Sequence, residues 1–191
     1  MKGRQGILLI MGDIALQFVD PKIVTNQFYL RPGDVVADFG AGHGAFVEPL
    51  VQAVTTEGIV YALEIQKNLV AAVGELARQR NYANVRVLWV DLEEPQGTTL
   101  DSDMLDCAVM VNTLFQIEDS ATALNEVLRT LRSGGKFFII DWTESFNHLG
   151  PEPAAVITPA DARAAAETAG FVFEREFPAG AHHYGLAFRK P

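Results

Sequence analysis

The sequence predicts an α/β fold with a mostly parallel β-sheet and helices on both of its faces. Three observations predict it. Short apolar runs alternate with amphipathic stretches, which is the pattern of strands joined by helical crossovers. Several apolar runs end at an acidic residue, and the first one leads into a loop with glycine at alternate positions. Two further apolar runs close the chain and are expected to form an antiparallel hairpin.

The first predicted strand covers residues 35–39 and leads into the loop Gly40-Ala41-Gly42-His43-Gly44. Glycine permits a sharp turn, and it lets a ligand approach the backbone with no Cβ in the way. Residues 43–54 are predicted to be helical, with Pro49 as the point where the helix can kink. The first N–H groups of such a helix have no partner inside it. Together with Asp38, the loop has the parts of a nucleotide-type binding site.

The glycine spacing separates this loop from two other nucleotide motifs. The dinucleotide fingerprint Gly-x-Gly-x-x-Gly needs its third glycine one residue later than Gly44. A P-loop needs Gly-Lys followed by Ser or Thr, and no such tripeptide follows. The spacing therefore disfavours a nicotinamide-binding domain and excludes a P-loop.

Four more predicted strands follow the loop, and each ends at a polar residue. They are residues 59–64, ending at Glu64; residues 85–91, ending at Asp91; residues 104–111, followed by Asn112; and residues 137–141, ending at Asp141. A carboxylate at the end of the second strand can accept hydrogen bonds from both hydroxyls of a ribose. Because ligands of open α/β sheets bind beyond the carboxyl ends of the strands, we expect these side chains on one rim.

Helices are predicted from apolar spacing and from capping residues. Asp20-Pro21 and Thr158-Pro159 are each typical of a helix start. The predicted helical stretches are residues 13–30, 43–54, 66–80, 119–131 and 158–169, and the closing strands are residues 171–176 and 184–189. We expect residues 20–191 to form a single domain, and residues 1–19 to form an N-terminal segment that could cover the site.

Asp38-Phe39-Gly40-Ala41-Gly42-His43-Gly44 resembles the first motif of class I methyltransferases that depend on S-adenosylmethionine (SAM), Asp-x-Gly-x-Gly-x-Gly. The later acids at Glu64 and Asp91, the Asn112-Thr113-Leu114 edge and the Gly134-Gly135 turn match the family in order. The chain is similar to small methyltransferases of ubiquinone and menaquinone biosynthesis, with some likeness to arsenite methyltransferases. The resemblance covers nearly all of the chain from Asp20 onward and implies a Rossmann-like, seven-stranded sheet.

The resemblance implies SAM as the cofactor. Glu64 would accept from the ribose diol, and Asp91 or the backbone of Leu92 would contact adenine. Asp38 has two interpretations of equal weight, contact with the cofactor or acceptance from the loop's own N–H groups. His43 is expected at the helix start or as a lid over the methionine group. The expected cofactor-binding residues are Asp38, Gly40, Ala41, Gly42, Gly44, Glu64, Ile65, Asp91, Leu92 and Asn112.

Methyl transfer from a sulfonium depends mainly on bringing the nucleophile to the methyl group in line. A base is needed only when the acceptor must lose a proton. The candidates for such a base are Asp141 and the cluster His182, His183 and Tyr184; Glu144 and His148 lie in the loop after the fifth strand. The alternative for the cluster is a hairpin with exposed histidines and a packed tyrosine. Phe115, Trp142 and Phe146 are either walls of an acceptor pocket or part of the core.

The composition of the chain limits which classes of binding partner and methyl acceptor we expect. The 191 residues suffice for one well-packed domain, and 49% hydrophobic with 20% charged residues is the balance of a soluble α/β protein. The net charge of −9 disfavours nucleic acid as the acceptor. The apolar run at residues 7–11 is shorter than the core of a secretory signal, and no membrane-spanning segment or metal site is predicted.

The single cysteine, Cys107, excludes an intramolecular disulfide and fits a reducing cytoplasm. It also excludes the set of cysteines that an arsenite methyltransferase needs. Asn112-Thr113-Leu114-Phe115 stands where amide- and adenine-methylating enzymes carry an Asn-Pro-Pro-Tyr motif. After these exclusions, a small molecule is the methyl acceptor that the sequence favours. The alternatives are methylation of protein or RNA, and a non-catalytic SAM-binding sensor or subunit.

Overall fold

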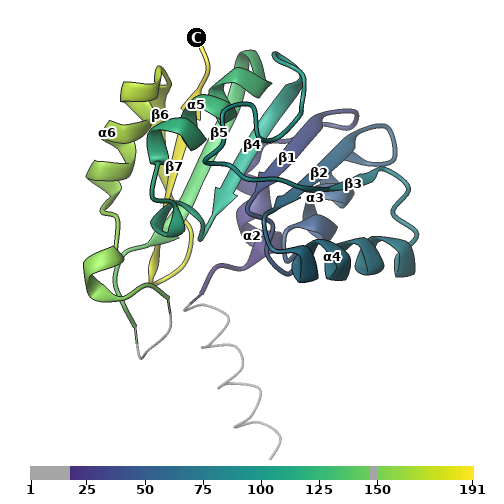
Figure 1. Ribbon diagram of the computed structural model, residues 1–191, viewed down its shortest axis with the longest axis horizontal. Helices are drawn as coiled ribbons and strands as arrows, with labels where there is room; N and C mark the ends of the chain where they lie inside the picture. Colours follow the sequence, from purple (N-terminus) through teal and green to yellow (C-terminus); the bar gives the residue numbers. More distant parts are fainter. Residues whose placement is uncertain (1–17, 147–149) are drawn as a thin grey trace, which may run out of the picture.

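Seven strands form one sheet in the order β3-β2-β1-β4-β5-β7-β6 (Figure 1). The computed structural model describes residues 18–146 and 150–191. The strands are β1 Val35–Phe39, β2 Ile59–Glu64, β3 Val85–Trp89, β4 Leu105–Val111, β5 Leu131–Trp142, β6 Val172–Pro178 and β7 His183–Arg189. Strands β1 to β5 pair in parallel, whereas β7 is antiparallel to both β5 and β6. The expected fold class, with its terminal antiparallel hairpin, is confirmed.

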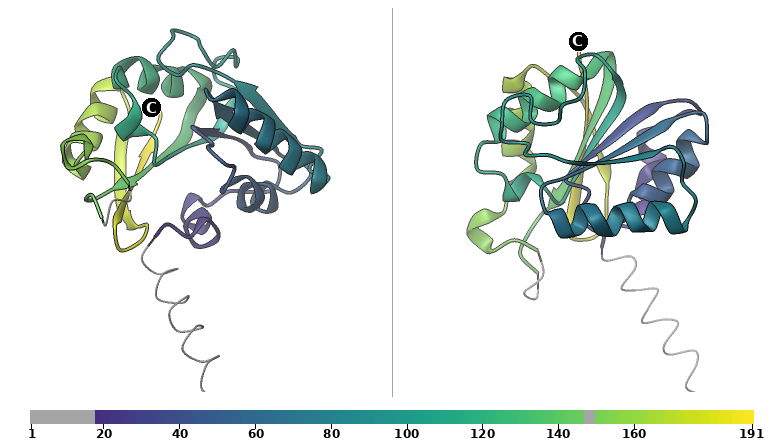
Figure 2. Two further views of the ribbon diagram at one scale, coloured as in Figure 1. Left: turned by 60° about the horizontal axis from the view of Figure 1, so that its bottom comes forward. Right: turned by 45° about the vertical axis from the view of Figure 1, so that its right-hand side comes forward.

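Helices cover both faces of the sheet (Figure 2). Their bounds are α2 Pro21–Thr25, α3 Val47–Val54, α4 Lys67–Gln79, α5 Ser120–Thr130 and α6 Pro159–Ala169, with 3-10 turns η1 Asn26–Phe28, η2 Leu114–Gln116 and η3 Pro153–Ala155. Helices α5 and α6 pack on one face, and α2, α3 and α4 pack on the other. No helix in the described part of the chain is both long and apolar enough to span a lipid bilayer.

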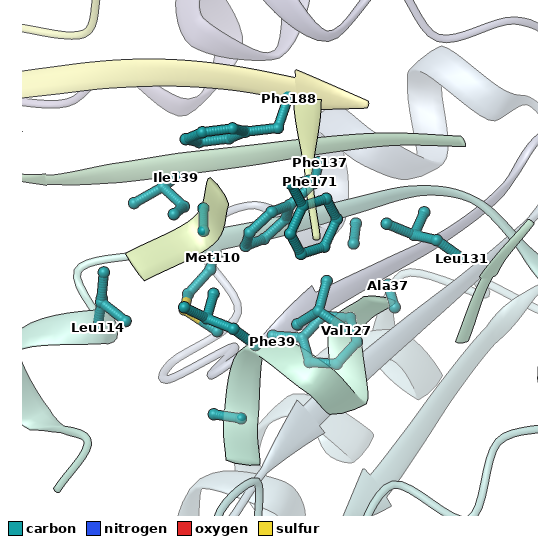
Figure 3. Packing of buried hydrophobic residues seen from close by; sticks show 14 of the residues in the cluster. Ala37, Phe39, Met110, Leu114, Val127, Leu131, Phe137, Ile139, Phe171 and Phe188 are labelled. Carbon is teal, nitrogen blue, oxygen red and sulfur yellow. The ribbon is translucent and has the colours of Figure 1, made fainter. Parts of the chain in front are cut away.

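Aromatic side chains fill the core between the sheet and α5. Phe39 of β1, Met110 of β4 and Phe137 of β5 converge there with Val127 of α5 (Figure 3). Neighbouring residues of the same strands, such as Val36, are buried on the opposite face. Parallel strands that are buried on both faces appear in a sequence as continuous apolar runs, which is why the sequence located them.

The capping signals act as the sequence predicts. The Asp20 carboxylate accepts from Lys22 N at 2.9 Å and from Ile23 N at 3.3 Å, and Pro21 is the first residue of α2. Thr158 Oγ1 accepts from Asp161 N at 3.1 Å at the start of α6. A left-handed glycine, Gly170, follows the end of that helix with φ of +108°.

Three predicted boundaries are wrong. Helix α3 begins at Val47 and not at residue 43, because residues 42–46 continue the glycine loop as turns. Pro49 therefore lies in the first turn, where its missing N–H leaves no bond unmade and no kink is needed.

The leading helix is short as well, since α2 ends at Thr25 and η1 follows it. Strand β5 already begins at Leu131, which pairs with Leu105, and the strand passes the two glycines through a register shift. Residues 1–17, which make up nearly all of the expected N-terminal cover, lie outside the described residues, as does His148.

Candidate functional site

A cavity of about 600 Å³ opens at the carboxyl ends of β1, β2 and β4. Strands β2 and β4 flank β1 on opposite sides, so the cavity lies at the point where the strand order reverses. Nine of the ten residues that the sequence assigns to the cofactor line it. They are Asp38, Gly40, Ala41, Gly42, Glu64, Ile65, Asp91, Leu92 and Asn112.

The glycine loop is held against the end of β2 by its own backbone. Gly40 N and Ala41 N both donate to Leu63 O at 2.9 Å. Gly42 has a φ of +54°, and a Cβ built there meets no atom within 4 Å. Gly42 thus presents bare backbone to the cavity, which leaves room for a ligand against the loop.

The other two glycines meet protein instead of open space. A Cβ on Gly40, whose φ is +88°, would collide with the side chain of Thr113. A Cβ on Gly44 would lie 3.2 Å from Val73 Cγ2 of α4. Gly44 does not line the cavity, and its lack of a side chain lets the loop pack closely on α4.

Glu64 connects the end of β2 to the loop. One carboxylate oxygen accepts from Gly42 N at 2.9 Å and the other from Gln66 N at 2.8 Å. Each carboxylate oxygen has a second lone pair, so Glu64 can still accept from two ligand hydroxyls. Holding the loop was one of the two roles expected of Asp38, and in the structure Glu64 performs it.

Asp38 and Asn112 line the cavity, and each has one buried side-chain oxygen that no described residue satisfies. Asp38 is 2% exposed, and its Oδ1, like Asn112 Oδ1, has no hydrogen-bond partner among the described residues. Burial, reinforced by the negative charge of Glu64, raises the pKa of Asp38 to about 7. Buried acceptors without a donor are costly, so both atoms suit a ligand that brings donors or positive charge. An ammonium and a sulfonium group, as in SAM, fit this end of the cavity.

The chain that follows β2 and β3 adds apolar side chains to the far end of the cavity. Leu69 and Leu92 are buried in its wall, whereas Ile65 is half-exposed at its edge. Asp91 Oδ1 accepts from Glu93 N at 3.0 Å, a local hydrogen bond that turns the chain after β3. An apolar wall with a carboxylate beside it suits a flat base such as adenine.

Asp141 is a buried carboxylate at the end of β5 that links this strand to η2. Its carboxylate accepts from Trp142 N at 2.8 Å and from Phe115 N at 3.3 Å, which holds η2 against the strand. Burial raises its pKa to about 6, although these backbone hydrogen bonds act in the opposite direction. Asp141 does not line the cavity.

His183 and Tyr184 lie in β7 opposite Trp142 and Asp141. His183 is 5% exposed, its ring nitrogens have no partner in the described structure, and burial, followed by the nearby His182, lowers its pKa to about 4. Burial also raises the pKa of Tyr184, with Asp141 adding to the effect. His183 is thus neutral and Tyr184 protonated at pH 7. The alternative of exposed histidines is wrong.

His182 is paired with a carboxylate. Its Nδ1 lies 2.8 Å from Glu144 Oε1, and its ring stacks on Phe146 with centroids 3.8 Å apart. The sequence places both residues on the rim but does not pair them, because they meet only when β5 and β7 align. His148, from the same loop, lies outside the described residues.

The cavity has further lining residues that the sequence reasoning did not assign to it. Gln116 and Ile117 enter its wall because the chain folds into η2 directly after β4. No sequence signal marks that turn. His43 is exposed on the cavity side, and it lies in the loop and not at a helix start, since α3 begins four residues later.

Comparison with known proteins agrees with this geometry. Residues 37–139 match the family model of the methyltransferase domain. The chain belongs to this methyltransferase family. It is a class I SAM-dependent methyltransferase domain, and SAM is its cofactor. Among solved structures, a SAM-dependent methyltransferase from Aquifex aeolicus superposes with a TM-score of 0.83 at 26% identity, over 91% of this chain and 90% of that one.

Curated relatives match over a shorter part of this chain. A 2-phytyl-1,4-naphtoquinone methyltransferase from Nostoc punctiforme is 26% identical over 61% of this chain and 50% of the relative. A ubiquinone/menaquinone biosynthesis C-methyltransferase from Marinomonas is 25% identical over 65% and 49%. An uncharacterised transposon protein from Streptomyces fradiae is 32% identical over 63% and 34%. The chain thus spans half or less of the length of these relatives.

Proposed function

We propose that this chain transfers the methyl group of SAM to a small-molecule acceptor by in-line displacement. The observation that carries the proposal is the cavity beside the glycine loop, which is lined by Glu64, Asp38 and Asn112. Asp38 and Asn112 each have a buried oxygen without a partner among the described residues. A ligand with a ribose diol and a cationic donor group satisfies all three.

The residues divide the cofactor between the two ends of the cavity. Glu64 accepts from the ribose hydroxyls, and Asp91 with the Leu92 backbone holds the adenine beside Ile65. Asp38 and Asn112 accept from the ammonium group. Bound SAM supplies an electrophilic methyl on a sulfonium, so the chain has only to bind the donor, exclude water and place the acceptor in line.

The net charge of the chain and the names of two similar proteins both favour a small-molecule acceptor. The net charge of −9 disfavours a broad surface for RNA phosphates. Two of the similar proteins carry names of quinone-pathway methyltransferases, which act on small molecules. The free, buried Cys107 fits a reducing compartment, so we place the activity in the cytoplasm. Residues 20–191 form the catalytic domain in this proposal.

The test is a transfer assay with SAM carrying a labelled methyl group. The protein is incubated in turn with a fractionated metabolite extract, total RNA and a protein extract, and Glu64→Gln serves as the variant with a damaged cofactor site. The proposal expects label in the small-molecule fraction from the wild-type protein only. Label in RNA or protein would contradict the proposed acceptor class. Tight binding of SAM with no transfer to any fraction would instead identify a sensor.

A further inference from the structure

A polar pair lies on the same rim as the cofactor cavity, two strands away from it. His182 directly precedes β7 and Glu144 follows β5, and they meet because these strands pair. Thr143 N donates to His182 O at 2.9 Å, which continues the ladder past the end of β5. Backbone and side chain therefore both fix His182 beside the Glu144 carboxylate, at 2.8 Å from Nδ1.

A groove of about 480 Å³ runs from the glycine loop to Phe18, a neighbour of His182. The groove shares Ala45 with the cofactor cavity. At its other side it is lined by Phe18, whose ring centroid lies 6.0 Å from that of His182 and 6.1 Å from that of Trp142. Phe146 closes the cluster with its ring 6.3 Å from Phe18. The groove itself has a mixed lining that includes Asp20, Lys22 and Glu48. The rings of Phe18 and Phe146 beside His182 form its aromatic end, which suits a flat aromatic ligand.

The pair has the arrangement of an oriented base. A carboxylate that accepts from Nδ1–H holds the proton on that nitrogen and leaves a lone pair on Nε2. A histidine so oriented can take a proton from a hydroxyl and is stabilised as the cation by the carboxylate. The Glu144 side chain is largely exposed, whereas the His182 side chain is 13% exposed, so the ring is sheltered from solvent and the carboxylate reaches it from the surface.

The other candidates on this rim lack that arrangement. Both Asp141 oxygens already accept backbone N–H groups. His183 is held neutral by burial, which lowers its pKa to about 4, and it has no carboxylate partner among the described residues. Burial raises the pKa of Tyr184, so its hydroxyl keeps its proton.

We propose that His182, positioned by Glu144, is the base of the reaction and that the acceptor is an aromatic compound with an ionisable hydroxyl. This inference rests on the proposed methyl transfer. The hydroxyl O–H bond breaks and the proton moves to Nε2 of His182. The oxygen lone pair forms the bond to the methyl carbon while the carbon–sulfur bond breaks. The bonding pair stays on sulfur, which leaves S-adenosylhomocysteine (SAH), and the imidazolium later returns its proton to water.

The experiment uses 4-nitrophenol, whose phenolate absorbs visible light and whose neutral form does not. Calorimetry first establishes that SAH binds the wild-type chain and each variant. Nitrophenol is then titrated into the SAH-loaded proteins at a pH where the free phenol is mainly protonated. The variants are His182→Gln, Glu144→Gln and, as an exposed-carboxylate control, Glu152→Gln.

The proposal expects a saturable phenolate band with the wild-type chain and Glu152→Gln, a weaker band with Glu144→Gln, and none with His182→Gln. With an acceptor in hand, His182→Gln should lower kcat by about 10²–10⁴-fold. No band from the SAH-loaded wild-type chain, or an equal band from His182→Gln, overturns the proposal. Absence of SAH binding appears in the calorimetry before any dye is added, and it would overturn the proposed function together with this inference.

Discussion

The Glu64 carboxylate accepts a hydrogen bond from the backbone N–H of Gly42 at 2.9 Å, which joins the end of β2 to the glycine loop. The residue expected to bind the ribose therefore also fixes the loop that the cofactor lies against. This double role couples loop geometry to cofactor affinity, because a change at either residue alters the surface that the ligand meets.

Gly42→Val should abolish SAH binding. A Cβ at this position meets no protein atom within 4 Å, so the added isopropyl group would extend into the space proposed for the cofactor, and the φ of +54° disfavours a branched residue as well. Calorimetric titration with SAH measures the loss, and circular dichroism checks that the sheet persists. Normal SAH affinity in this variant would contradict the loop's role.

Gly40→Ala should destabilise the fold as well as the site. The new methyl would collide with Thr113, and the φ of +88° adds backbone strain of about 1–3 kcal/mol. Thr113→Ala in the same chain removes the atoms nearest to the new methyl, so it should restore part of the lost free energy of unfolding. Urea denaturation of the single and double variants measures this, and strictly additive losses would contradict the contact.

Stability should depend on pH through Asp38. Its pKa is raised from 3.8 to about 7, so between these values the folded chain holds a proton that the unfolded chain has released. The free energy of unfolding then decreases as pH rises from about 4 to 7, by up to about 1.4 kcal/mol per pH unit from this group. Asp141, with a pKa raised to about 6, adds a slope of the same sign.

Asp38→Asn should remove the Asp38 part of that slope, because the amide does not titrate. Urea denaturation of both proteins at several pH values between 4 and 8 measures the difference. Parallel curves for the wild-type chain and Asp38→Asn would show that Asp38 ionises normally in the fold.

Much of the fold could be predicted because each strand is a buried apolar run with a definite end. Strand β2 has the predicted bounds, and the caps at Asp20 and Thr158 begin helices where expected. The start of α3 could not be predicted, because the residue types after the glycine loop are compatible both with turns and with the first turn of a helix. Four residues of continued loop move the helix to Val47.

The details of the site depend on contacts between residues distant in the chain. The division of roles between Asp38 and Glu64 follows from which carboxylate reaches the Gly42 amide, and no local pattern encodes that. The pairing of Glu144 with His182 needs the alignment of β5 with β7. Sequence placed these residues on one rim, whereas their partners required the folded chain.

The cofactor site is tested most simply by calorimetric titration of SAH into the wild-type chain, Glu64→Ala and the exposed control Glu57→Ala. We expect a dissociation constant of about micromolar for the wild-type chain and the control. Glu64→Ala should lose about 1.5–3 kcal/mol of binding free energy, which is roughly 10- to 150-fold in affinity. Equal affinity in Glu64→Ala, or no SAH binding by the wild-type chain, would contradict the proposed cofactor site.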